Sequence, residues 1–218
     1  STNPADYKIY INPGHGGYDS DDRLMYLYPI FVGSTVQPGY TREQSFWEST
    51  SNLDKGLRLD TILRDLGFQT KMSRIHNTTA DDRSLSGISA EASTWNADFM
   101  LSIHSNAGNP SNYILHLHSG ITPGDPYGLG GYCNSYDDNG DGVIDRKVYD
   151  IVSQEVCDEA RAITTLMGKN QYSNQVSCWS REPNIAGDKT FARTIMGWPN
   201  GYGVMRNLKV PGTISEGM

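Results

Sequence analysis

The chain has 218 residues, a formal net charge of -7, 37% hydrophobic residues and 20% charged residues. This composition is typical of a globular protein, and the length allows one α/β domain with a substantial core. An acidic chain is a poor candidate for binding nucleic acid through its phosphates, and no apolar run of roughly 18 residues is present to span a membrane. The chain begins with a polar segment and without methionine, which predicts an extracytoplasmic protein whose signal peptide has been removed.

The three cysteines do not point to a metal site. Cys133, Cys157 and Cys178 form no CxxC pair and lie in no Cys/His cluster. The odd count permits one disulfide and one free thiol, or three thiols, and it does not decide the redox compartment.

The first half of the chain alternates strands and helices. Residues 7–11 predict a strand that leads into a glycine-rich turn at residues 12–17. Residues 18–41 are rich in Gly, Pro, Asp and Tyr, which predicts a loop, and loops of that length tend to be functional. Leucine and isoleucine at helical spacing predict a helix over residues 47–66 that ends at Gly67.

The alternation continues through the second half. A strand at residues 68–72, a helix at 84–96 and strands at 98–103 and 113–118 come next. Residues 120–145 are rich in Gly, Pro, Asp and Asn, which indicates an irregular insertion at about residues 119–146. The last predicted elements are a helix at 147–167, which ends at Gly168, and strands at 202–206 and 213–215.

This order predicts a single α/β domain over residues 1–218, with a twisted, mostly parallel sheet and helices on both faces. The chain stops just after the apolar-rich stretch 210–215, so we expect its C-terminal end to be truncated. Ligands of such sheets bind outside the carboxyl ends of the strands. His15, His104 and Glu216 each follow a predicted strand, and the chain has only 5 histidines.

These residue types are those of a catalytic zinc site. Such a site uses three His or carboxylate ligands and leaves one position to water, whose pKa falls to roughly 7, and a nearby Glu can take the proton. Two histidines from strand ends, one Glu from a neighbouring helix and one further Glu would meet this need. Glu43 and Glu48 both precede the apolar repeat of the first long helix.

Three blocks of the sequence resemble the zinc-dependent N-acetylmuramoyl-L-alanine amidases of amidase type 3. They are Asn-Pro-Gly-His-Gly-Gly-Tyr-Asp at 12–19, Ser-Ile-His-Ser-Asn-Ala at 102–107 and Val-Pro-Gly-Thr-Ile-Ser-Glu-Gly at 210–217. The resemblance covers residues 7–218 and implies zinc ligands at His15, Glu48 and His104, with Glu216 as the catalytic residue. Glu48 rather than Glu43 matches the family's spacing to the following leucine and to Gly67.

The resemblance implies an enzyme that cleaves the amide bond between N-acetylmuramic acid and L-alanine in peptidoglycan, with peptidoglycan or a muropeptide as its partner. Asn106 either orients substrate or braces its loop. Family members usually carry an Arg where this chain has Ile88, although Arg83 lies just upstream. Two alternatives stay open: a related zinc amidase or peptidase with another substrate, and a non-catalytic wall-binding module, which this departure favours together with a calcium-like loop and the truncated end.

Two weaker signals remain. Asp137, Asn139, Asp141 and Asp145 are spaced as in a calcium-binding loop, but position 12 is Val148, so an Asp/Asn/Gly surface turn is an equal alternative. His116 and His118 lie two residues apart on one strand face, where pocket lining or strand packing is favoured over metal binding.

Overall fold

The computed structural model describes residues 3–17, 22, 24–26, 31–32, 35–36, 46–105, 115–120, 135–136, 146–147, 154–173, 184–198, 201–206 and 208–217. A six-stranded sheet forms the centre of this part of the chain, in the order β11-β8-β12-β7-β1-β6. Its strands are β1 (Lys8–Pro13), β6 (Gln69–Met72), β7 (Phe99–Ser105), β8 (Leu115–His118), β11 (Asn184–Gly187) and β12 (Gly212–Gly217).

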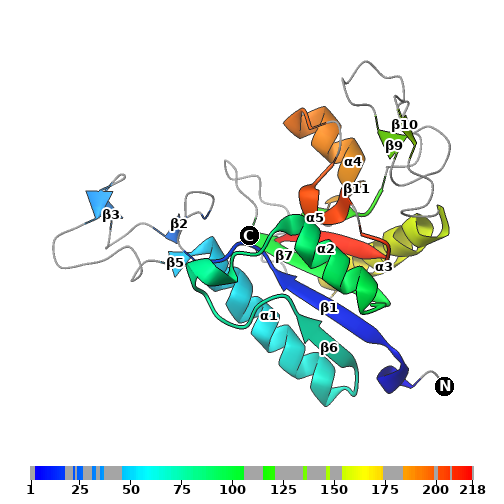
Figure 1. Ribbon diagram of the computed structural model, residues 1–218, viewed down its shortest axis with the longest axis horizontal. Coiled ribbons are helices and arrows are strands. Elements are labelled where there is room, and N and C mark those ends of the chain that lie inside the picture. The colour runs from blue at the N-terminus through cyan, green and yellow to red at the C-terminus, as the bar shows by residue number, and fades with distance from the viewer. Residues whose placement is uncertain are drawn as a thin grey trace.

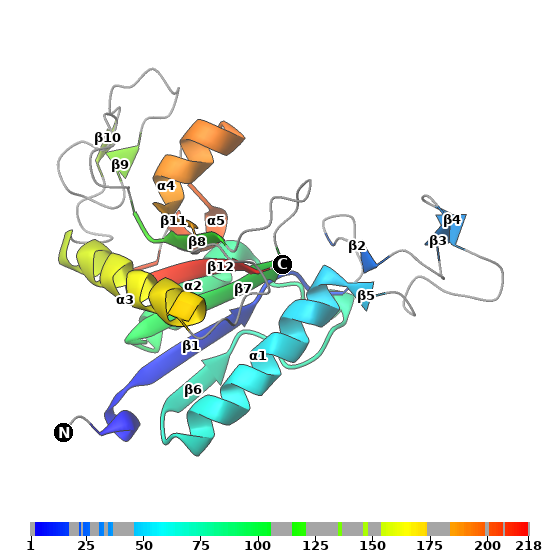
Figure 2. The same cartoon turned by 180° about the vertical axis from the view of Figure 1, so that it is seen from behind.

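Four of the five neighbouring strand pairs are parallel, and only β12 and β8 are antiparallel. Helices α1 (Glu48–Asp65) and α3 (Gln154–Ser173) cover one face of the sheet, and α2 (Leu85–Thr94) and α5 (Gly203–Arg206) cover the other (Figures 1 and 2). The predicted α/β class, with a mostly parallel sheet and helices on both faces, is confirmed.

The main apolar core lies between the sheet and the layer of α2 and α5. Tyr10, Met100 and Ile214 point from the three central strands into this core and are almost fully buried. They meet Ile88 of α2 and Met205 of α5. Because successive strand residues point to opposite faces, the alternate residues of the same strands face α1 and α3.

Shorter elements lie around this frame. α4 (Asp188–Phe191) leads into a π-helical turn, Ala192–Met196, and two 3-10 turns cover Pro4–Asp6 and Thr79–Asp81. Three two-stranded ribbons pair β2 (Leu24–Tyr26) with β5 (Phe46–Trp47), β3 (Phe31–Val32) with β4 (Thr35–Val36), and β9 (Ser135–Tyr136) with β10 (Arg146–Lys147). Among the helices that the structure describes, none is both long enough and apolar enough to cross a bilayer.

The predicted strand at residues 202–206 is wrong. Residues 203–206 form the helical turn α5, in which the Met205 and Arg206 N–H groups donate to the Tyr202 carbonyl. Val204 and Met205 are both buried, and two consecutive buried residues fit a helical turn better than a half-exposed strand. β11 and α4 were not predicted.

The bounds of the predicted helix at 147–167 are also wrong. Arg146–Lys147 belong to the ribbon strand β10, and α3 begins only at Gln154. Gly168 does not end the helix, which continues to Ser173. Gly168 is buried inside α3, so tertiary packing overrides the local stop signal.

Candidate active site

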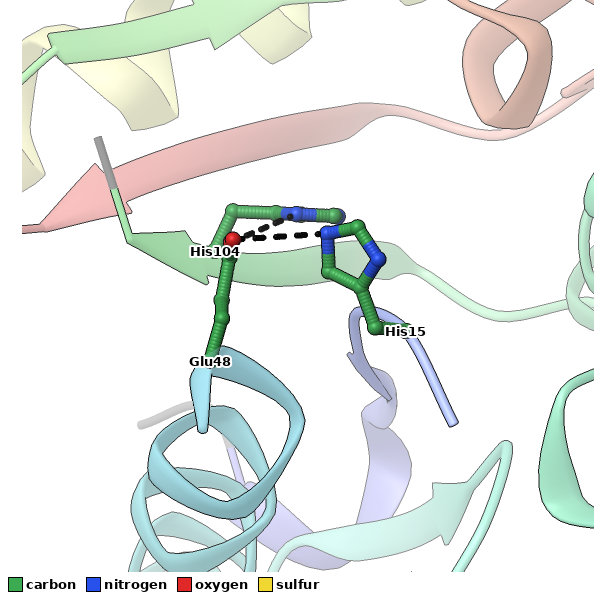
Figure 3. Close-up of side chains that lie close together, drawn as sticks. All are labelled: His15, Glu48 and His104. Carbon is green, nitrogen blue, oxygen red and sulfur yellow. Dashed lines mark ion pairs between the residues drawn. The ribbon is translucent and has the colours of Figure 1, made fainter. Parts of the chain in front are cut away.

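Three side chains from distant parts of the chain meet at the carboxyl end of the sheet (Figure 3). His15 Nε2 lies 3.5 Å from Glu48 Oε2, and His104 Nδ1 lies 3.4 Å from Glu48 Oε1. One ligand atom from each of the three residues lies within 4.8 Å of the others. A tetrahedral zinc with bonds of about 2.1 Å separates its ligand atoms by about 3.4 Å, so this donor set fits a metal of that size.

The glycine-rich loop after β1 holds His15 in an uncommon backbone conformation. His15 has φ 61, in the left-handed region, and the preceding Gly14 donates its N–H to the Ile103 carbonyl at 2.9 Å. A Cβ on Gly14 would come within 2.2 Å of the His104 ring. A glycine is therefore required at position 14, because the loop passes directly against the ring of His104.

Glu48 is the first residue of α1 and is fully buried. Its Oε1 accepts the Ser105 N–H at 3.0 Å and lies 3.5 Å from the Asn52 amide nitrogen. Burial raises the pKa of Glu48, but the contacts with His104, His15 and the Ser105 N–H together hold that pKa far below its usual value. The side chain is thus an anion at neutral pH, as a metal ligand must be.

A polar clamp that the sequence analysis missed joins the segments of His15 and Glu48. Arg74 is 5% exposed and donates to the carbonyls of Pro13 at 2.9 Å, Gly14 at 3.0 Å and Ser49 at 2.8 Å. It also donates to the His76 carbonyl at 3.0 Å and to Asn77 Oδ1 at 3.1 Å.

Asn77 is the second member of this clamp. Its Oδ1 accepts the Gly17 N–H at 3.1 Å, and its amide donates to the Ser49 hydroxyl at 3.0 Å. Both clamp residues follow the carboxyl end of β6, a position at which the strand-end rule could have found them.

Glu216 lies on β12 in register with His104 on the neighbouring parallel strand β7. Glu216, His15 and His104 line one cavity of about 510 Å³. Tyr202 lines the same cavity, and its pKa is raised to about 12 by burial and by the negative charges of Glu216 and Asp188. One cavity therefore contains two imidazoles that can bind a metal and a carboxylate that can exchange protons.

Comparisons with known proteins identify the family of the chain. A family model described as N-acetylmuramoyl-L-alanine amidase matches residues 9–216. The chain belongs to this amidase family. A sporulation-specific N-acetylmuramoyl-L-alanine amidase of Bacillus subtilis (strain 168) is 32% identical over 116 residues, which are 52% of this chain and 37% of that protein. The match thus spans little more than a third of that relative's length.

Solved amidase structures share the fold at low identity. An N-acetylmuramyl-L-alanine amidase from Mycobacterium smegmatis has a TM-score of 0.58 and 14% identity, with 99% of this chain and 83% of that chain covered. The catalytic domain of an N-acetylmuramoyl-L-alanine amidase from Bacillus (Paenibacillus) polymyxa var. colistinus has a TM-score of 0.53 and 16% identity, with 96% and 79% covered. At these identities the likeness shows the amidase fold alone.

The departure from the amidase pattern at Ile88 has a structural explanation. Ile88 is 6% exposed and belongs to the apolar core. Arg83 lines the cavity that contains His15, His104 and Glu216, and it donates to the Ser73 carbonyl at 3.0 Å and to Glu91 at 2.5 Å.

His116 and His118 do not join the cluster of His15, Glu48 and His104. Both are buried on β8, the His118 ring nitrogen Nδ1 lies 3.2 Å from the Ser119 carbonyl, and burial lowers the pKa of His118. Neither lines the cavity, so strand packing describes them better than pocket lining.

Several predicted residues lie outside the described part of the chain. They are Glu43, Asn106, and the calcium-loop residues Asp137, Asn139, Asp141 and Asp145. The calcium site and the role of Asn106 stay predictions. Cys157 is disulfide-bonded, which favours the alternative of one disulfide over that of three thiols.

Proposed function

We propose that this chain is a zinc-dependent hydrolase that cleaves the amide bond between N-acetylmuramic acid and L-alanine in bacterial peptidoglycan. The convergence of His15, Glu48 and His104 beside Glu216, in a chain of the amidase family, is the observation that carries this proposal. Two imidazoles and one carboxylate with a fourth position open are a donor set that zinc hydrolases use.

A zinc ion held by these three residues would supply Lewis-acid chemistry, polarising the scissile carbonyl and stabilising negative charge on its oxygen. Glu216 then acts as the proton carrier. Its carboxylate takes a proton from the attacking water, whose oxygen bonds to the carbonyl carbon, and passes that proton to the nitrogen as the C–N bond breaks. The products are the lactyl carboxylate of the sugar and the free amine of L-alanine.

The surrounding residues support these roles. Burial of Glu48 and its bond from the Ser105 N–H keep this carboxylate fixed between the two histidines. The Arg74–Asn77 clamp keeps the loop of His15 and the start of α1 together, so the three ligands need little rearrangement to bind a metal. Because peptidoglycan lies outside the cytoplasmic membrane, we also propose an extracytoplasmic location.

Glu216→Ala tests the proposal against a matched control. We expect the variant to bind one zinc per chain, as the wild type does, and to lose about a thousandfold in turnover of a purified muropeptide. Glu159→Ala removes an exposed carboxylate of α3 and should change neither value. Zinc is measured by elemental analysis, and cleavage is measured by mass spectrometry of the released peptide.

Two outcomes would contradict the proposal. If Glu216→Ala cleaves muropeptides at the wild-type rate, Glu216 is not the proton carrier. If wild-type protein binds zinc and muropeptide without cleaving it, the wall-binding alternative replaces the enzyme.

A further inference from the structure

Part of the lining of the candidate active-site cavity consists of large apolar side chains. The described residues that form it, hereafter the apolar wall, are Leu85, Phe191, Ile195, Met196, Trp198 and Tyr202. Four of them are large side chains with unusually high exposure: Leu85 at 52%, Ile195 at 66%, Met196 at 44% and Trp198 at 46%. Exposed apolar side chains that gather in one cavity beside reactive groups mark a ligand-binding surface.

The apolar wall is fixed by several contacts. The Trp198 and Tyr202 rings meet edge to face, with centroids 5.4 Å apart at 75°. The Trp198 N–H donates to the Ala192 carbonyl at 2.9 Å, and the buried Asp188 accepts the Tyr202 N–H at 3.3 Å and the Gly120 N–H at 2.7 Å.

The hydrogen bonds of Asp188 and Tyr202 join the apolar wall to the starts of α4 and α5. Asp188 begins α4, and Tyr202 directly precedes α5; both helices lie near β11 and β8 (Figures 1 and 2). The wall therefore presents its aromatic rings in a preformed arrangement, which lowers the entropy cost of binding.

The charges of the cavity lie elsewhere among its described lining residues. They come from Glu216, beside His15 and His104 at the proposed metal site, and from Arg74, Asp81, Asp82 and Arg83 in the segment after β6. The six residues of the apolar wall carry no charge. A group that binds against these side chains is favoured when it offers an apolar surface, because a polar group without a hydrogen-bond partner would lose free energy on burial.

The inference that follows rests on the proposed function. The preference for an apolar surface distinguishes the sugar arm of the proposed substrate from its peptide arm. The peptide arm carries backbone amides and carboxylates along its length. The sugar arm offers the C–H face of a pyranose ring and the methyl groups of its lactyl and acetyl substituents. We propose that the apolar wall is the subsite for the sugar ring of N-acetylmuramic acid, with Trp198 as its stacking face. Aromatic side chains suit such ligands because they pair an apolar face with a polar edge.

Two substrates that share the scissile amide test this assignment. One is N-acetylmuramoyl-tripeptide, and the other is D-lactoyl-tripeptide, which keeps the lactyl–alanine bond but lacks the sugar ring. Wild-type protein should favour the sugar-containing substrate in kcat/KM. Trp198→Ala should reduce this preference by about tenfold, the effect expected from one lost stacking contact. Trp198→Phe, which keeps an aromatic face, should recover most of it.

Leu166→Ala is the matched control, because Leu166 is also an exposed apolar residue, 60% accessible, and it lies on α3 at the other face of the sheet. This variant should leave the preference unchanged. Zinc content and the melting temperature are measured for every variant, and the exposed Trp198 side chain should be removable without unfolding.

The assignment is overturned if Trp198→Ala lowers kcat/KM equally on both substrates, because the wall would then bind the peptide arm or support the site as a whole. It is also overturned if Trp198→Ala changes neither substrate, or if wild-type protein has no preference for the sugar. In each of these cases the amidase activity itself still stands. Cleavage of neither substrate by zinc-loaded wild-type protein would instead remove the proposed function.

Discussion

Replacement of Arg74 by alanine should weaken the metal site without touching a metal ligand. The guanidinium joins three buried carbonyls, those of Pro13 and Gly14 before His15 and that of Ser49 after Glu48. Burial lowers the pKa of Arg74 to about 10, partly offset by Asp81, Asp22 and Asp82, so the group remains charged at neutral pH. Arg74→Ala removes a cation that bonds both segments at once.

The expected magnitude follows from these bonds. A hydrogen bond to a charged group contributes about 1.5–3 kcal/mol, and three carbonyls lose such a bond, although the Gly14 carbonyl keeps the Asn52 amide donor at 3.2 Å. Allowing for water that enters the space, we expect metal-free Arg74→Ala to lose about 3–5 kcal/mol of unfolding free energy. Loss of residues that orient metal ligands typically reduces metal affinity by about 10–100-fold, and we expect a loss in that range. Arg74→Lys keeps the charge but not the planar fork of N–H donors, so its stability and its metal affinity should lie between those of the wild type and of Arg74→Ala.

Metal affinity is measured by competition with a chromophoric chelator, and stability by urea unfolding of the metal-free protein. Arg83→Ala is the matched control, since Arg83 bonds to Ser73 and Glu91 but to neither segment that carries a ligand. It should lower stability and leave zinc affinity near the wild-type value. Equal zinc affinities in Arg74→Ala and Arg83→Ala would refute the clamp as a positioning device.

Two further predictions concern acid stability and the glycine loop. Burial raises the pKa of Glu91, but bonds from Tyr10, Lys71 and Arg83 lower that pKa more, to about 2. Glu91 therefore contributes about 3 kcal/mol to the free energy of unfolding. This contribution is complete above about pH 4.5 and is lost as the pH falls toward 2. Urea midpoints of the metal-free protein between pH 7 and pH 2.5 should therefore fall less in Glu91→Gln than in the wild type, and parallel curves would contradict this. Gly14→Ala should displace the His104 ring, which its Cβ would approach to 2.2 Å, and should reduce zinc affinity at least tenfold by chelator competition. Gly87→Ala is the control: its Cβ meets only the Ser84 hydroxyl, and it should not change the zinc affinity. An unaltered zinc affinity in Gly14→Ala would contradict the prediction and show that the loop of His15 adapts.

Local sequence patterns were sufficient to predict the helix and strands that carry the candidate site. Apolar strands at residues 7–11 and 98–103 and a long amphipathic helix near residue 48 were predicted close to where β1, β7 and α1 lie. Their positions in a parallel sheet then predicted that His15 and His104 would meet, since parallel strands end at the same edge. The choice of Glu48 depended on a resemblance to a family, because no local pattern separates it from Glu43.

Where tertiary contacts decide conformation, local sequence patterns predicted the wrong element or none. Residues 202–206 are apolar enough for a strand, yet they form α5 because Val204 and Met205 fill the core beside α2. Gly168 is a helix stop by local rules, yet it lies buried within α3. The Trp198–Tyr202 contact depends on a π-helical turn that has no simple sequence signal.

The sequence by itself determined the α/β class, the strand ends that carry His15, His104 and Glu216, and the donor chemistry, because each follows from periodicity and residue type over a few positions. Only the tertiary structure decided how these groups are held. The Arg74–Asn77 clamp, the contact of Gly14 with the His104 ring and the apolar wall all join residues that are far apart in the chain. Such contacts depend on how helices and loops pack against the sheet, and no local pattern encodes that packing.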